Sequence, residues 1–306
     1  MRTPARRREG ESTGWAANPV DRSKRRLKII GSKRVWMRNT KCMADYSEVQ
    51  HGFEMLQRFF ANATKKKEFC EALDDVSQNM AHEAIHLFDQ WWADIRFGTY
   101  VTSISEHDEK EDLHGRLSMW RAFGGNAARV AIVLRIPWRS PATDALNIVF
   151  SPVAYSQEPE AHSVMAEVVK NVQAERDFLR SVERPVVLAS VFNMLVTTVT
   201  CSKHEGFHEE REWRVIYAPR RFPSDLMESS LEVIGGIPQI VYKLPLDAKA
   251  SDALEDLDAA RVFDRLIIGP SEFSWPMYEA FTKALTAIGV EQADKRVFIS
   301  AIPIRS

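Results

Sequence analysis

The side chains best suited to chemistry in this sequence are concentrated between residues 204 and 214. This segment holds two histidines, four glutamates and two arginines, and it runs directly into a strand-like apolar segment at 215–217. Imidazoles and carboxylates bind metals and exchange protons, whereas arginines bind carboxylates and phosphates. Three interpretations follow: a zinc-hydrolase helix, the acidic start of a strand in a nucleotide-binding sheet, or a solvated charged turn.

The zinc interpretation rests on His204-Glu205-Gly206-Phe207-His208, which matches the pattern H-E-x-x-H. In that pattern two histidines one helical turn apart bind zinc, and the glutamate activates the bound water. A glycine inside the helix costs about 1 kcal/mol relative to alanine, and the chain must become extended by Trp213. No nearby downstream histidine supplies a third ligand. A zinc metallohydrolase therefore stays an alternative, and it predicts that both histidines lie on one face of a continuous helix.

Other enzyme classes lack their motifs. Phe123-Gly124-Gly125-Asn126 does not fit the dinucleotide pattern G-x-G-x-x-G, and the sequence contains neither a P-loop nor G-x-S-x-G. The cysteines at 42, 70 and 201 are widely spaced and form no C-x-x-C pair, so a disulfide framework and a thiolate metal site are not indicated. This cysteine usage favours a cytoplasmic location.

Charge is distributed unevenly along the chain. Residues 1–34 contain eleven basic and three acidic side chains, although the whole chain has a formal net charge of −1. Such a head suits nucleic acid or an acidic membrane, but a solvated terminus is the simpler interpretation because no aromatic residues are interleaved with Arg6-Arg7-Arg8. No run reaches the roughly 18 apolar residues of a membrane helix, so we expect no membrane partner.

Hydrophobic periodicity predicts both helices and strands without a regular βαβ alternation. Helices are expected at about 47–61, 67–97, 117–122, 159–202 (broken near Pro185) and 275–288. Strands are expected at about 34–39, 99–105, 130–136, 145–155, 213–217, 231–234, 239–244, 265–268 and 297–304. We therefore predict an α+β fold with a mixed or antiparallel sheet. Residues 1–26 form a basic, disordered head, and 27–306 form a single domain with a helical insertion at about 157–202.

Five short motifs occur in a characteristic order between residues 33 and 270. They are Lys33–Asn39 with Met43–Glu48, Tyr100–Glu106, Leu117–Gly124 with Val130–Ile132, Gly206–Arg214, and Ile267–Pro270. In this order they resemble the bacterial domain of unknown function 2971 family. The family's order of elements is in turn similar to that of ADP-ribosyltransferase domains, so the resemblance implies an ADP-ribosyltransferase-like fold.

The resemblance also implies site residues. The strand at Thr102–Ser105 is similar to the S-T-S strand of the transferases, and Glu210 with Glu212 is similar to their E-x-E pair. Glu212 would then hold the ribose 2′-OH of NAD and stabilise the positive charge that develops as nicotinamide leaves. Glu210 would orient the acceptor, a protein or a nucleic acid. Strand alternation is expected to put both glutamates on one face.

The resemblance also implies residues that support Glu212 and residues that bind NAD. Ser103 or Ser105 would hold Glu212 in place, and Arg121 or Arg38 would bind a phosphate of NAD. The resemblance implies that the protein is a toxin or phage-defence effector. Its sequence departs from the family at 18–26, which lacks the usual Tyr-Thr-bearing first strand. The alternative is a non-catalytic or degenerate interaction module of the same fold, in which arginines pair with the glutamates as a structural ion network.

Overall fold

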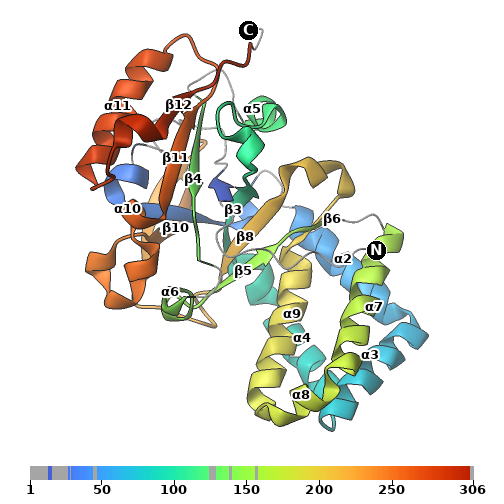
Figure 1. Cartoon of the computed structure of the whole chain (residues 1–306). Coiled ribbons are helices and arrows are strands. Elements are labelled where there is room, and N and C mark those ends of the chain that lie inside the picture. The colour runs from blue at the N-terminus through green and yellow to red at the C-terminus, as the bar shows by residue number, and fades with distance from the viewer. Residues whose placement is uncertain are drawn as a thin grey trace. The chain divides into compact units, whose positions relative to one another are not determined.

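The computed structural model describes residues 13–15, 27, 29–43, 47–123, 129–137, 140–155 and 158–303 (Figure 1). The chain forms two compact units. The first consists of Met1–Asn39, Tyr100–Phe150 and Glu209–Ser306, and the second of Thr40–Thr99 and Ser151–His208. The fold class is α+β, as predicted. The sequence led us to expect one domain with an insertion at 157–202. In the structure the helices of that insertion belong to the second unit, together with those of residues 40–99.

A ten-stranded sheet forms the framework of the first unit. Its strands run in the order β12-β11-β4-β1-β3-β2-β10-β9, and β8 pairs with β3 and β5 off this path. The strands are β1 (Thr13–Trp15), β2 (Arg34–Asn39), β3 (Tyr100–Glu106), β4 (Val130–Leu134), β5 (Ile148–Pro152), β8 (Glu212–Tyr217), β9 (Glu228–Ile234), β10 (Ile237–Pro245), β11 (Phe263–Ile268) and β12 (Val297–Ile299). β11 and β12 are parallel, whereas β3 pairs antiparallel with β1, β2 and β8. This confirms the predicted mixed sheet.

Strand β1 corrects the prediction of a disordered head. Thr13–Trp15 pair antiparallel with both β3 and β4. A three-residue strand has little local signal, and it exists here through long-range pairing with two neighbours. The other residues of 1–26, including the segment 18–26, lie outside the described residues.

Hydrophobic clusters cover both faces of the sheet. One face carries the main core, to which Ile104, Val215 and Leu266 contribute from strands and Phe281 from α11 (Ser274–Ala287). On the other face Trp120 of α5 (Leu117–Phe123) packs with Val133 and Ile267. The unit also contains α6 (Pro141–Ala145), α10 (Ala259–Val262) and the short 3-10 helices Glu109–Glu111, Ala248–Ala250, Asp252–Leu257 and Ala293–Arg296.

The second unit is helical. Its helices are α2 (Ser47–Ala61), α3 (Ala63–Val76), α4 (Met80–Gly98), α7 (Glu158–Ala174), α8 (Arg176–Ser181) and α9 (Arg184–Thr200), with a 3-10 helix at Thr40–Cys42 and a small parallel sheet of β6 (Ala154–Tyr155) and β7 (Ser202–Lys203). They share one hydrophobic core. None of the described helices is long and apolar enough to cross a membrane.

The single helix predicted at 67–97 was wrong, because α3 ends at Val76 and α4 begins at Met80. Asn79 has a left-handed backbone (φ 63°), a conformation that asparagine tolerates better than most residues. Both helices face the same core, so the apolar period continues across the break and the sequence shows no interruption. The helix expected at about 47–61 is confirmed as α2, which starts at Ser47.

Candidate functional site

The antiparallel pair β3–β8 forms the centre of the candidate site (Figure 1). Its register sets Ser105 opposite Glu212 and Ser103 opposite Arg214. Residues that face each other across such a pair lie on the same side of the sheet, and every second residue returns to that side. Ser103, Ser105, Glu212 and Arg214 therefore share one face, which we call the polar face. The opposite side of the same two strands is the apolar face.

Glu212 is held by two side chains of the polar face. Ser103 Oγ donates a hydrogen bond to Glu212 Oε1 over 2.5 Å. Arg214 Nε donates to the same oxygen over 2.8 Å, and its Nη2 lies 3.5 Å from Oε2. The Glu212 and Arg214 side chains are each only 6% exposed. A buried carboxylate needs such partners to stay charged, and Ser103 of β3 is one of them.

Glu210 occupies a different position from the one predicted. It ends the 3-10 helix Glu205–Glu210, and Arg211 follows with a left-handed backbone (φ 43°) before β8 begins at Glu212. Glu210 is therefore not on the strand, and the expectation that alternation places it on one face with Glu212 was wrong. Its backbone carbonyl nevertheless reaches the site, because it accepts a hydrogen bond from Ser105 Oγ over 2.5 Å.

Arg116, which the sequence reasoning missed, connects the parts of the site. Its guanidinium donates to the carbonyl oxygens of Glu106 (2.6 Å), Glu209 (2.7 Å) and Glu210 (3.3 Å). It also donates to Ser105 Oγ over 3.1 Å. Arg116 thus ties the end of β3 to the turn that precedes β8. In the sequence, Arg116 stands out only because it directly precedes the predicted helix at 117–122. That position does not indicate which groups it contacts.

Glu111 balances the charge of this connection. It accepts hydrogen bonds from Arg116 Nε over 2.8 Å and from Arg211 Nη2 over 2.6 Å. Asp108 lies beside it, and the hydrogen bond from the Lys110 amide, followed by smaller contributions that include Arg211, lowers the pKa of Asp108. The turn before β8 is therefore fixed through charged side chains on both sides.

The two arginines proposed to bind phosphate differ in position. Arg38 pairs with Val101 across β2 and β3, so the register puts it on the polar face, where its Nε donates to Gln239 Oε1 over 3.1 Å. Arg121 is exposed on α5, and it makes no hydrogen bond or ion pair with any residue that the structure describes. The register thus places Arg38 on the face of the serines and Glu212, whereas none of the described contacts joins Arg121 to them.

The two histidines do not lie on the continuous helix that a zinc site requires. His204 precedes the 3-10 helix, and its Nδ1 accepts a hydrogen bond from the Gly206 amide over 3.1 Å. His208 Nδ1 lies 3.0 Å from the Glu205 carbonyl. Within the described ranges, no group of three or more histidine, cysteine or acidic residues is arranged to hold a metal ion.

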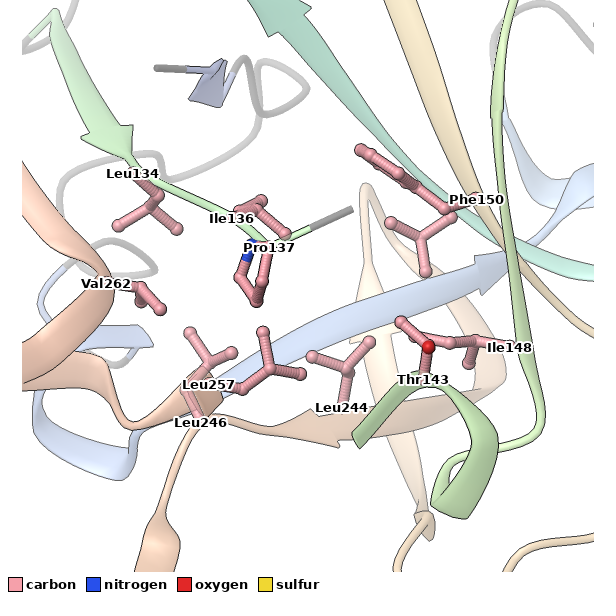
Figure 2. Close-up of a pocket in the computed structure, with 11 residues that line it drawn as sticks. Leu134, Ile136, Pro137, Thr143, Ile148, Phe150, Leu244, Leu246, Leu257 and Val262 are labelled. Carbon is pink, nitrogen blue, oxygen red and sulfur yellow. The ribbon is translucent and has the colours of Figure 1, made fainter. Parts of the chain in front are cut away.

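Figure 2 shows a cavity of about 30 Å³ in the first unit. Val215 lines it from the apolar face of β8, beside Phe150 and Leu244. Thr143 is the one polar residue among those that line it. A charged nucleotide needs polar partners that this lining does not offer, so the cavity is a packing gap in the core.

Comparison with known proteins gives one match. Residues 119–215, about a third of the chain, match the family model described as "Protein of unknown function (DUF2971)". The match supports the resemblance to this family over the third and fourth of the five motifs, and it includes Arg121, Glu210 and Glu212. No curated protein and no solved structure is significantly similar to the chain.

Proposed function

We propose that this chain, which is similar to the DUF2971 family over residues 119–215, is an ADP-ribosyltransferase-like protein that binds NAD on the polar face of β3 and β8. The observation that carries the proposal is the hydrogen bond of 2.5 Å from Ser103 Oγ to Glu212 Oε1. It joins the two residues that the motif order assigns to one ribose, although 109 positions separate them in sequence.

The proposed chemistry is cleavage of the bond between ribose C1′ and the nicotinamide nitrogen. The bonding pair leaves with nicotinamide, and C1′ develops positive charge until a lone pair of the acceptor forms the new bond and the acceptor proton is released. A carboxylate beside the ribose stabilises that charge and accepts a hydrogen bond from the 2′-OH. A carboxylate offers about four lone-pair positions, so the bond from Ser103 orients Glu212 without using its whole capacity.

The neighbouring groups have supporting roles in this proposal. Arg38 would bind a phosphate of NAD from the same face, as its register position on β2 allows. The turn at Glu209–Glu210 would face the acceptor, with Arg116 holding its carbonyls. A toxin or phage-defence effector is the biological setting we propose for such an activity.

A second candidate is a non-catalytic module of the same fold. It is favoured by the buried ion pair of Glu212 and Arg214, whose Nε lies 2.8 Å from Oε1. Buried ion pairs also occur as purely structural features, where each charge satisfies the other without a ligand. In this candidate Arg211 and Glu111 extend the same structural network.

Glu212→Gln separates the two candidates. The amide keeps an oxygen that can accept hydrogen bonds from Ser103 and Arg214 while the negative charge is lost, and far-UV circular dichroism of the variant checks that it is folded. We expect the wild type to show a rise in Tm with NAD and to release nicotinamide, and Glu212→Gln to lose the release by at least about 100-fold. Glu228→Gln, at a carboxylate that is 59% exposed on β9, is the matched control and should behave as wild type. Absence of both the shift and the release in the wild type would leave the non-catalytic module.

A further inference from the structure

The hairpin of β9 and β10 presents an apolar surface to solvent. Ile234 and Ile237 are joined by Gly235 and Gly236, both with positive φ (61° and 80°), as a two-residue hairpin turn requires. The register pairs Leu231 with Ile240 and Val233 with Pro238 on one side of the hairpin. Leu231 is 75%, Val233 68% and Ile240 50% exposed. Exposed β-branched and leucine side chains in a row mark an interaction surface more often than an isolated apolar residue does.

Strand β9 also has an open hydrogen-bonding edge. It ends the strand order of the sheet, and its one partner among the described strands is β10. Natural proteins usually protect such an edge with prolines, bulges or charged side chains. The seven residues of β9 contain no proline, and their pairing with β10 runs from Glu228 to Ile234 without a bulge. Its two charges are compensated within the chain, Glu228 by Arg34 and Glu232 by Lys243.

We propose that a second copy of this chain covers this edge, through antiparallel pairing of β9 with β9 of the copy centred on Leu231. A two-fold axis at Leu231 sets this residue opposite itself and joins two hairpins into a continuous sheet. Leu231 of each copy then lies between the other copy's Leu231 and its own Ile240, which forms one apolar row across four strands.

The charge pattern of the strand selects this register. With Leu231 at the centre, Glu232 faces Ser230 and Glu228 faces Ile234, so no glutamate meets another. A shift of the centre to Ser230 sets Glu228 opposite Glu232, and a shift to Glu232 sets that residue opposite itself. Like charges directly opposite each other destabilise a strand pair. Centring on Leu231 also pairs all seven residues, which any shift reduces.

Charge variants at the axis test the proposal on the full chain. Wild type should form dimers in sedimentation equilibrium at a protein concentration on the order of 0.1 mM. Leu231→Glu and Leu231→Lys should each raise the dissociation constant about tenfold or more, because each residue meets its own copy. An equal mixture of the two variants should restore dimers, as glutamate then faces lysine.

Ile237→Glu is the matched control, since Ile237 is 55% exposed but is the first residue of β10, outside the edge strand β9, and lies on the other side of the hairpin. It should dimerise as wild type does, and far-UV circular dichroism should show that all variants are folded. A monomeric wild type would overturn the proposal. Dimers that persist in both charge variants, or that the mixture fails to restore, would overturn it as well.

Discussion

The two faces of β8 are both buried, yet they are stabilised in different ways. Glu212 and Arg214 on the polar face are joined by hydrogen bonds of fixed geometry. Trp213, Val215 and Tyr217 on the apolar face belong to the main hydrophobic core, where Trp213 stacks on Phe150 with ring centroids 5.1 Å apart. Removing one partner of a buried polar pair leaves the other charge unpaired and strongly destabilises the fold. On an apolar face, the loss of stability is proportional to the contact area removed. Substitutions on the two faces should therefore differ in size and in additivity.

Removal of Arg214 should have the largest effect. Arg214→Met leaves the Glu212 carboxylate buried without its cation, and breaking a buried ion pair in this way costs about 3–5 kcal/mol. Urea unfolding at neutral pH should show a loss of stability in this range. The double variant Glu212→Leu/Arg214→Met removes both charges and should recover most of that loss. If the double variant is no more stable than Arg214→Met, the two residues are not energetically coupled and the contrast between the faces fails.

Arg116→Gln should have the next largest effect on the polar face. The substitution removes donors from the carbonyls of Glu106, Glu209 and Glu210, of which Glu210 keeps its bond from Ser105, and because these carbonyls are part-buried or exposed the loss should lie near or below about 1 kcal/mol. Amide hydrogen exchange should become faster at the turn before β8, while the apolar face stays protected. Arg135→Gln is the control, because Arg135 also bonds a carboxylate, Asp264 at 2.8 Å, but is 62% exposed. Unchanged exchange at the turn in Arg116→Gln would contradict the connecting role of this arginine.

The apolar face should respond to added volume. Val215 lines the cavity of Figure 2, so Val215→Ile places a methyl group in empty space and should raise stability by up to about 1 kcal/mol. Val35 of β2 is buried in the same main core and is not among the residues that line that cavity. Val35→Ile should therefore destabilise the protein, by about 1–3 kcal/mol through overpacking. Thermal melts compare the two, and equal shifts in Tm would show that the cavity does not accept the added group.

Most strands and helices could be predicted where one local pattern dominated. β2 at 34–39 and α5 at 117–123 lie within a residue of the expected bounds. Two features depend on contacts between distant residues and escaped prediction. Thr13–Trp15 form a strand because they pair with β3 and β4. The helix break at 77–79 is not visible in the sequence because α3 and α4 pack into one core, so the apolar period continues across it. Local sequence carries little information about either.

The site residues that strand pairing places next to each other could be predicted from the sequence. Motif order brought Ser103 and Glu212 together, since both lie on strands whose alternation is regular. Arg116 could not be found in the same way, because its acceptors are mainly backbone carbonyls that carry no residue-specific signal. The same reason explains Glu210, whose carbonyl takes part through a turn that the left-handed backbone of Arg211 creates.

An exposed ion pair in the helical unit can be compared with the buried pair of β8. Removing its arginine should cause the smallest loss of stability among these variants. Arg184 Nη2 lies 2.5 Å from Glu83 Oε2, with the two side chains 41% and 40% exposed. The hydrogen bond from Arg184 lowers the pKa of Glu83 from its usual 4.5. A carboxylate whose pKa is lower in the folded state stabilises the fold above its unfolded pKa, and this contribution is lost as the pH falls through the folded value.

Arg184→Gln should therefore be less stable than wild type at neutral pH, by much less than Arg214→Met, because solvent screens exposed charges. The difference between Arg184→Gln and wild type should shrink as the pH falls below 4.5, the usual pKa of this carboxyl group, since Glu83 then becomes protonated in wild type as well. Urea unfolding at a series of pH values measures this difference. A difference that persists in acid would come instead from the bonds of Arg184 to Ser77 Oγ (3.0 Å) and to the Gln78 carbonyl (3.5 Å), which do not titrate. The pH profile thus assigns the contribution of this arginine to charge or to neutral hydrogen bonding.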